Sequence, residues 1–282
     1  MDDHSHGTHC AGIIAAVGNN NTGVIGFAWQ TKLMALKLFS AYGEFAAVSD
    51  VADCFYYVIS MKQNGVNVRI ASNSYGTSIY YQNFHDAIQA AATNGIFVIA
   101  AAGNDYLDMD QDGGKYEYLA CFADENVISV AAMDRSGNMP EFSSYGSKSV
   151  DLSAAGKDIL STIPGNGYGN MSGTSMAAPH VAGVAALLFG HDPSLTLARA
   201  RRLLLDGADP NSALPIGGRT ATDGYVNAAN SLAMLDAVAA PMFNPPTGFH
   251  DTNTVFVTME SEPPEQRYIT RLMVLHRTRL PQ

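Results

Sequence analysis

The sequence predicts an α/β fold in which helices cover both faces of a mostly parallel sheet. Short apolar runs alternate along the chain with longer segments of helical periodicity. A glycine, Gly65 or Gly95, follows each of the two clearest helical segments, where a left-handed cap is needed. Such alternation is typical of a parallel sheet covered on both faces, with its functional site at the carboxyl ends of the strands. The expected strands are 32–38, 68–74, 96–102, 126–132 and 150–154, and the expected helices are 46–64 and 83–94.

Composition indicates one globular domain followed by a tail. The 282 residues, 47% of them hydrophobic, are enough to bury a sizeable core. From Ala240 onward, prolines alternate with polar residues. We therefore expect a domain over residues 1–238 and a Pro-rich linker and tail over residues 239–282. Within that tail, residues 267–279 are basic with interleaved aliphatic side chains, which fits either a short strand or a short helix.

Charge, hydropathy and cysteine content narrow the possible partners. A net charge of −10 argues against nucleic acid, because phosphate binding needs a basic patch. The chain has no run of 18 apolar residues, so a membrane span is not expected. The three cysteines leave at least one unpaired, and their wide spacing matches no metal-binding pattern.

Ser175 lies in the most informative segment, residues 173–183, where a tight turn leads into a helix of small residues. A serine hydroxyl attacks carbonyls poorly unless a base takes its proton and donors hold the resulting oxyanion. The candidate base is His6, in another turn that leads into a helix rich in Gly and Ala. The candidate donor is Asn104, which closely follows the apolar run 96–100.

In this order, the His, Asn and Ser motifs resemble those of the subtilisin-like serine proteases, from residue 1 to about residue 235. The His motif is similar to that of the proteinase K-like branch. A Gly-x-Ser-x-Gly elbow is excluded because Ala177 occupies its fifth position. The resemblance implies a three-layer subtilisin-like fold and a serine endopeptidase acting on polypeptides. It makes Ser175 the nucleophile, His6 the general base, and the Asn104 side chain an oxyanion donor beside the Ser175 N–H.

The resemblance also shows a departure, because the family's triad runs in the order Asp, His, Ser. Only Asp2 and Asp3 precede His6, and both are too close in sequence to reach its ring from a separate strand. We therefore expect the chain to lack its N-terminal part: the prosegment, the early strands and the triad Asp. Unpaired backbone groups in the resulting gap would cost about 1–3 kcal/mol each. Two functions remain open: an endopeptidase without its N-terminal part, or an inactive remnant that at most binds peptides.

The resemblance further implies how substrate is bound. An extended peptide pairs with one segment, and two segments form the walls of the S1 pocket, which receives the side chain before the scissile bond. These walls are Ser74, Tyr75 and Gly76 on one side, and Ala101, Ala102 and Gly103 on the other. In a loose alignment Glu117 falls near the pocket base, although a solvated Glu117 is the alternative. The family is largely secreted, so an extracellular protein is expected, and we expect it to be a monomer.

Two segments are candidates for calcium. The first resembles the family's calcium loop and would use the Asn20 side chain with the carbonyl oxygens of Gly18, Thr22 and Val24. That site would be incomplete, and an Asn/Gly-rich turn needs no ion. The second is Asp108-Met109-Asp110-Gln111-Asp112-Gly113, where a true EF-hand is excluded because its twelfth position is Leu119. The carboxylates of that segment could still hold calcium, and the alternative is a solvated acidic loop that binds no ion.

Two further residues of the His motif have structural interpretations. His9 lies one turn beyond His6 and is expected to be a packed helix histidine rather than the base. In the proteinase K-like branch, a residue in the place of Cys10 lies as a buried free thiol beneath the catalytic histidine. The alternative for Cys10 is a plain small core residue.

Overall fold

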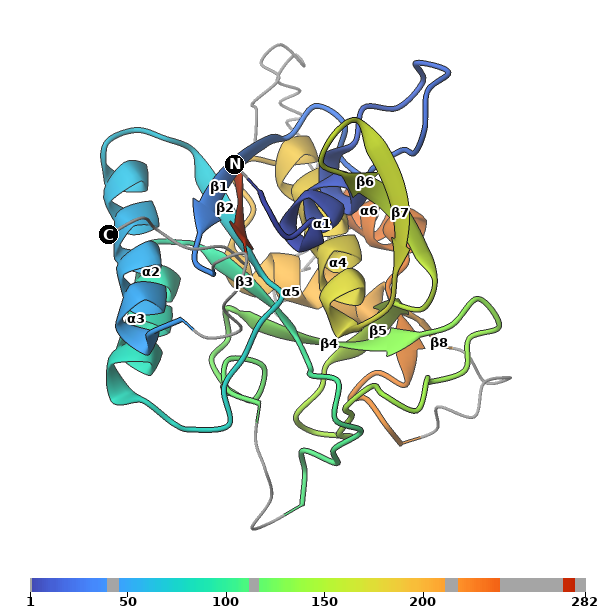
Figure 1. Ribbon diagram of the computed structural model, residues 1–282. Helices are drawn as coiled ribbons and strands as arrows, with labels where there is room; N and C mark the ends of the chain where they lie inside the picture. The colour runs from blue at the N-terminus through green and yellow to red at the C-terminus, as the bar shows by residue number, and fades with distance from the viewer. Residues whose placement is uncertain (1, 40–45, 112–116, 211–217, 239–270, 277–282) are drawn as a thin grey trace, which may run out of the picture.

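The computed structural model describes residues 2–39, 46–111, 117–210, 218–238 and 271–276, the last of these by its backbone alone. A central sheet lies between two layers of helices (Figure 1). The helices are α1 (His6–Ala15), α2 (Val48–Gln63), α3 (Gln82–Thr93), α4 (Thr174–His191), α5 (Leu197–Asp206) and α6 (Ala228–Val238). The strands of the sheet are β1 (Lys32–Lys37), β2 (Val68–Asn73), β3 (Phe97–Ala101), β4 (Val127–Met133), β5 (Leu152–Ala155), β8 (Asp209–Pro210), β9 (Gly224–Tyr225) and β10 (Arg271–His276).

The sheet is mostly parallel, as expected. Its strand order is β1-β10-β2-β3-β4-β5-β9-β8, and only the β8–β9 pair is antiparallel. All five predicted strands and both predicted helices are present, with ends shifted by at most two residues. Gly65 and Gly95 follow α2 and α3 at φ +88° and +65°, the left-handed conformation that a Cβ disfavours.

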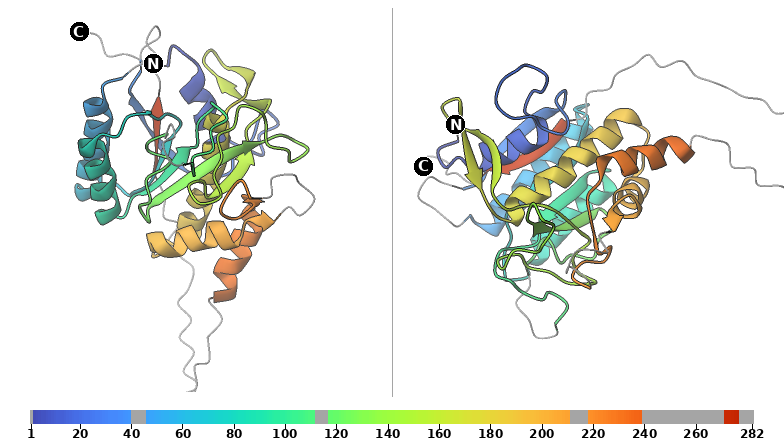
Figure 2. Two further views of the ribbon diagram at one scale, coloured as in Figure 1. Left: turned by 90° about the horizontal axis from the view of Figure 1, so that it is seen from below. Right: turned by 90° about the vertical axis from the view of Figure 1, so that its right-hand side faces the viewer.

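Two apolar cores hold the layers together. Phe55 of α2 and Phe84 of α3 pack on one face of the sheet with Val98. On the other face, Ile14 of α1 and Val181 of α4 pack with further strand residues, and Figure 2 shows these helices side by side. The central strands β2, β3 and β4 are buried almost throughout because helices cover both of their faces.

A hairpin outside the main sheet was not expected from the sequence. Strands β6 (Ile159–Ile163) and β7 (Gly167–Met171) pair antiparallel, and β6 packs against α1. The ring Nε2 of His9 donates to the carbonyl oxygens of Ile159 and Gly169, at 2.9 and 3.0 Å. His9 is fully buried, so the expectation of a packed helix histidine is confirmed.

The expected gap in the sheet is wrong for this structure, because β10 fills it. This strand lies between β1 and β2 and pairs parallel with both (Figure 1). Ala35 is in register with position 274 on one side, and Ser72 is in register with it on the other. The strand therefore supplies backbone partners along the inner edges of β1 and β2. The rest of the expected linker and tail, residues 239–270 and 277–282, lies outside the described residues.

The topology brings four chain segments to one end of the sheet. The carboxyl ends of β2 and β3 lead into the segments 74–76 and 102–104, and the N-termini of α1 and α4 carry His6 and Ser175. This end of a parallel sheet is where a site was expected. None of the described helices is long and apolar enough to span a bilayer.

Candidate active site

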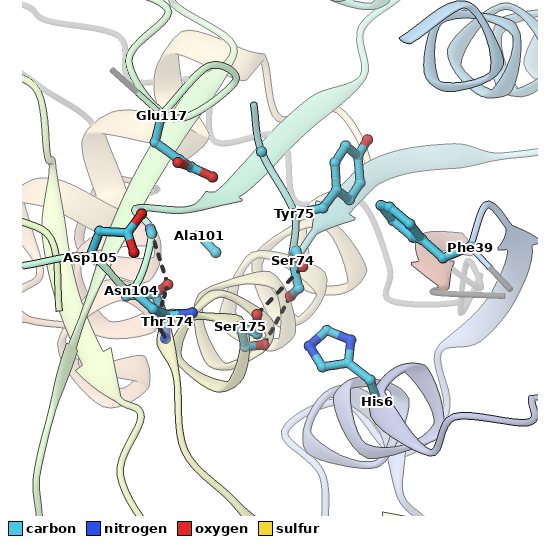
Figure 3. Close-up of a pocket in the computed structure, with 12 residues that line it drawn as sticks. His6, Phe39, Ser74, Tyr75, Ala101, Asn104, Asp105, Glu117, Thr174 and Ser175 are labelled. Atoms are coloured by element: carbon cyan, nitrogen blue, oxygen red, sulfur yellow. Dashed lines mark hydrogen bonds between the residues drawn. The ribbon is translucent and has the colours of Figure 1, made fainter. Parts of the chain in front are cut away.

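A cavity of about 300 Å³ lies at these strand ends and brings the three predicted catalytic side chains together. His6, Asn104 and Ser175 all line it, although they come from distant parts of the chain (Figure 3). The expected pocket walls line it as well, namely Ser74, Tyr75, Gly76, Ala101 and Gly103. Ala102 differs: its side chain is buried in the core on the α2/α3 side.

Ser175 occupies the first turn of α4, where the helix leaves its first N–H groups without intrahelical partners. Gly173 precedes this turn at φ +154°, and its N–H donates to Gly156 O at 2.7 Å. The positive end of the helix dipole thus lies at the cavity, where it favours developing negative charge. The Ser175 hydroxyl donates weakly to Ser74 O at 3.4 Å, which leaves it close to the substrate wall.

The Ser175 carbonyl has unusual partners because Pro179 lies four residues later. Proline has no N–H, so the intrahelical hydrogen bond to Ser175 O cannot form. The Ser74 hydroxyl donates to this oxygen at 2.9 Å, and the Cys10 thiol approaches it at 3.3 Å. These contacts tie α4 to α1 and to the segment that follows β2, directly beside Ser175. Residue 74 therefore has a structural role in addition to the expected substrate contact.

Cys10 is a buried free thiol, as the resemblance implied. Burial raises its pKa to about 12, so it stays protonated and acts as a hydrogen-bond donor at neutral pH. His180 of α4 is partly buried, and its Nδ1 is 2.8 Å from Met176 O. Burial lowers the pKa of both His180 and His9, which favours their neutral forms.

His6 is the first residue of α1, and its ring lies beside Ser175 in Figure 3. Asp2 and Asp3 precede it, and each binds other groups among the described residues. Asp2 accepts hydrogen bonds from the backbone N–H groups of His4, Ser5 and Thr8 at 2.8–3.0 Å, and from the Thr8 hydroxyl at 2.6 Å. It therefore caps the helix that carries His6. Asp3 forms an ion pair with Lys37 at 3.3 Å.

Asn104 is oriented by a residue that sequence reasoning did not single out. Its Oδ1 accepts from the Thr174 N–H at 2.9 Å and from the Thr174 hydroxyl at 3.1 Å. The same hydroxyl accepts from the Gly103 N–H at 3.1 Å. With Oδ1 engaged in this way, Nδ2 is left to serve as a donor toward the cavity. The position of Thr174 directly before the nucleophile was the available signal.

Tyr75 stiffens one wall of the cavity. Its hydroxyl donates to Asn73 Oδ1 at 2.9 Å, and Asn73 Nδ2 in turn donates to the backbone oxygens of Ala71 and Ile99. Burial raises the Tyr75 pKa well above its ordinary value, so the phenol stays neutral. This network ties the segment after β2 to β3.

Glu117 lines the same cavity, which the loose sequence alignment had only suggested. A Cβ added to Gly76 would lie 2.2 Å from Glu117 Oε1, and one added to Gly103 would lie 3.3 Å from Glu117 Cγ. The side chain therefore rests between the two walls and uses the space that these glycines leave. Burial, reinforced by the negative charge of Asp105, raises the Glu117 pKa to about 7.

The loop with Gly18, Asn20, Thr22 and Val24 carries only neutral oxygen donors. Asn20 Oδ1 already accepts from the Thr22 N–H at 3.1 Å, and the Thr22 hydroxyl donates to Asn20 O at 3.3 Å. Asn20 and Thr22 are exposed. Oxygen ligands suit calcium, but tight sites add carboxylates, and this loop has none. The loop thus fits part of a calcium site at most.

The acidic segment after Asn104 has a structural explanation. Asp110 accepts hydrogen bonds from the hydroxyls of Ser147 and Ser149 and from the backbone N–H groups of Lys148 and Ser149. These bonds lower its pKa although partial burial opposes them. Asp108 accepts from Asp110 N and from Gln111 Nε2. Asp112 and Gly113 lie outside the described residues. Among the residues that are described, no group of three or more His, Cys, Asp or Glu side chains could hold a metal.

A serine, a histidine and an amide side chain lie around one cavity at the carboxyl ends of parallel strands, which is the arrangement that a serine hydrolase requires. Comparison with known sequences then assigns the family. The chain belongs to the Subtilase family (Peptidase_S8), whose sequence profile matches residues 1–233. The chain is thus a member of the subtilisin-like serine endopeptidases.

Individual relatives agree with this assignment. The chain is 40% identical over 188 residues to a thermophilic serine proteinase of Bacillus sp. (strain AK1). The aligned residues make up 67% of this chain and 43% of that relative. It is 37% identical over 208 residues to subtilisin Savinase of Lederbergia lenta, an alignment that covers 74% of this chain and 71% of that relative. Subtilisin-like protease 1 of Plasmodium falciparum is 34% identical over 221 residues, an alignment that covers 73% of this chain and 31% of that relative. For the thermophilic proteinase and several other curated relatives, the chain spans about half of their length.

Proposed function

We propose that this chain is an endopeptidase in which Ser175 attacks the carbonyl carbon of a peptide bond. His6 takes the hydroxyl proton as the new C–O bond forms, and later gives it to the leaving amine. The Ser175 N–H and Asn104 Nδ2 hold the oxyanion. The observation that carries this proposal is the convergence of His6, Asn104 and Ser175 on one cavity. Water then cleaves the acyl-enzyme by the same steps.

We further propose that substrate lies extended along the segment 74–76, with the side chain before the scissile bond between the two walls. The wall residues are Ser74, Tyr75, Gly76, Ala101 and Gly103. Main-chain hydrogen bonds along such a segment give affinity without demanding a particular sequence. This arrangement suits cleavage within polypeptides.

The proposed mechanism assigns no triad acid to Asp2 or Asp3. Asp2 caps α1 and Asp3 pairs with Lys37. In serine proteases of this kind, a triad acid orients the imidazole and stabilises the imidazolium. In subtilisin itself, loss of that acid lowers kcat roughly 3 × 10⁴-fold, a known value that sets the scale of the acid's contribution. The contacts of Asp2 and Asp3 with other groups favour a second candidate, an inactive subtilisin-like protein that binds peptides.

Reaction with a fluorophosphonate separates these two functions. The probe phosphonylates an activated serine and needs no substrate recognition. We expect slow labelling of Ser175, located by peptide mass spectrometry, and none in Ser175→Ala. Replacement of the exposed Ser136 by Ala is the matched control and should leave labelling unchanged. Persistent labelling in Ser175→Ala would place the nucleophile elsewhere, and an unreactive chain would favour peptide binding alone.

We also propose an extracellular, monomeric protein for which calcium is at most a weak ligand of the loop 18–24. The neutral donors of that loop and the existing Asn20–Thr22 hydrogen bond support weak binding. EDTA should therefore lower the melting temperature by less than about 2 °C, because a ligand stabilises only when its concentration exceeds its Kd. A larger EDTA effect that Asn20→Ala abolishes would contradict this expectation.

A further inference from the structure

The floor of the active-site cavity is chemically distinct from its walls. The walls present Gly76, Ala101 and Gly103, which have small side chains or none. Glu117 lies between them and fills the space beside Gly76. In Figure 3, Glu117 and His6 lie on opposite sides of Ser74 and Ser175. A substrate side chain that enters between the walls therefore meets the Glu117 carboxylate at the end farthest from the base.

The charge around this carboxylate is negative. Asp105 lines the same cavity, and within the described part of the chain no Lys or Arg forms an ion pair with Glu117. A half-buried carboxylate without a cation is costly to ionise. A ligand that brought its own positive charge would remove that cost. The small wall residues leave room for the aliphatic stem of a Lys or Arg side chain, whose charged head can then reach the carboxylate.

From this geometry we propose that Glu117 selects substrates with a Lys or Arg side chain before the scissile bond, received between the segments 74–76 and 101–103. The inference rests on the proposed function, since it names the substrate class of the same site. The Glu117 carboxylate forms a charge-assisted hydrogen bond with the ammonium or guanidinium group. A large uncharged side chain instead covers the carboxylate without offering it a donor. Such substrates are bound less well.

The selection depends on pH. Burial raises the Glu117 pKa to about 7, so the carboxyl is neutral below that pH and charged above it. Among the described residues, the other titratable groups that line the cavity or interact with Glu117 are Asp105, Cys121, Tyr75 and His6. Cys121 and Tyr75 stay neutral because burial raises their pKa values, that of Cys121 to about 12. Asp105 adds negative charge, and His6 lies at the far end. Preference for a cation therefore grows as the pH rises through about 7.

Binding of p-aminobenzamidine tests this inference without requiring turnover. The compound carries an amidinium group, and its fluorescence rises in an apolar pocket. We would titrate the full chain at pH 8 and at pH 5.5, with uncharged p-aminobenzamide as the reference ligand. Variants would be Glu117→Gln, Glu117→Asp and, as a matched control on an exposed residue, Glu125→Gln.

We expect the amidinium to bind the unmodified chain at pH 8 at least about 10-fold more tightly than the amide, as for other buried charge pairs. Glu117→Gln should lose this preference, Glu117→Asp should keep part of it, and Glu125→Gln should keep all of it. The preference should also shrink at pH 5.5 in the unmodified chain, a result that needs no variant. Equal binding of the two ligands at pH 8, or full preference in Glu117→Gln, would overturn the inference.

Fluorophosphonate labelling distinguishes this failure from failure of the proposed function. The probe has no side chain to place between the walls, so its reaction with Ser175 is independent of Glu117. Labelling without a preference for the amidinium contradicts the inference alone. An amidinium preference without labelling contradicts the proposed chemistry, and leaves Glu117 as the cation-binding group of a peptide-binding site.

Discussion

At the residue scale, Ser175 is held by groups to which the proposed mechanism assigns no chemical step. Pro179 removes one hydrogen bond from Ser175 O, and Ser74 and Cys10 replace it from other elements. Thr174 fixes Asn104 and Gly103 with one hydroxyl. Each of these small polar residues joins chain segments that are distant in sequence. These hydrogen bonds hold the site residues in place, as the proposed oxyanion stabilisation requires.

Asn104→Leu tests the oxyanion donor. The substitution keeps the approximate volume of the side chain but removes Nδ2. If the chain hydrolyses a peptide measurably, kcat should fall roughly 10²–10³-fold with little change in KM, the loss known from the corresponding donor in subtilisin itself rather than one obtained from this geometry. Steady-state kinetics would measure both constants. A change in KM alone would show that Asn104 binds the ground state.

Glu117→Gln should change the pH dependence of stability. The folded-state pKa of Glu117, about 7, exceeds its ordinary value of 4.5, so the folded state binds more protons between these pH values. The free energy of unfolding therefore loses a contribution as the pH rises from about 4.5 to about 7. The variant has no such loss and should be more stable than the unmodified chain at pH 8, by about 1–2 kcal/mol after allowance for partial exposure.

Urea unfolding at pH 5 and pH 8 would measure this difference. The Glu125→Gln variant again serves as the control, because Glu125 is exposed. A difference between Glu117→Gln and the unmodified chain that is equal at both pH values would contradict a raised Glu117 pKa.

At the scale of elements, the sequence predicts regular segments better than it predicts how distant segments pair. The strands β1 to β5 and the helices α2 and α3 follow from apolar runs and glycine caps, which are local signals. The hairpin β6–β7 was missed because its strands are short and only partly buried. The placement of β10 depends on an open position between β1 and β2, which no local pattern encodes.

In the site, too, residues in local sequence motifs were predicted, whereas residues that matter through distant contacts were not. His6, Ser175 and Asn104 were found because each lies in a distinctive motif beside a turn. Thr174 and Glu117 were missed or left open, since their importance arises from contacts across the fold. Thr174 meets Asn104 from 70 positions away, and Glu117 fits beside Gly76 only once both loops are in place.

Val274→Pro tests the contribution of β10. Proline removes the N–H at a position where the strand has a neighbour on both sides, Ala35 in β1 and Ser72 in β2. We expect the free energy of unfolding to fall by about 1–3 kcal/mol, the cost of unpaired buried backbone groups. Val274→Ile keeps the N–H and the β-propensity and should unfold like the unmodified chain. Equal denaturation midpoints for the two variants would show that β10 adds no stability to the sheet.

At the scale of the whole molecule, the fold brings His6, Ser175 and Asn104 to one cavity, and Asp2 and Asp3 bind other groups. If neither acid takes part in catalysis, as we propose, the chain should react with an electrophilic probe but hydrolyse peptides slowly. We expect hydrolysis of chromogenic peptides close to background, and rates of a fully active subtilisin-like enzyme would contradict our assignment of Asp2 and Asp3.

The proposed activation of Ser175 by His6 is tested most directly by the second-order rate constant for phosphonylation of Ser175, measured from pH 5 to 9 in the unmodified chain and in His6→Gln. We expect a rate that rises with pH as the imidazole loses its proton, and a fall of at least about 10²-fold in His6→Gln, the scale of general-base catalysis. Equal rates in the two proteins at every pH would contradict it.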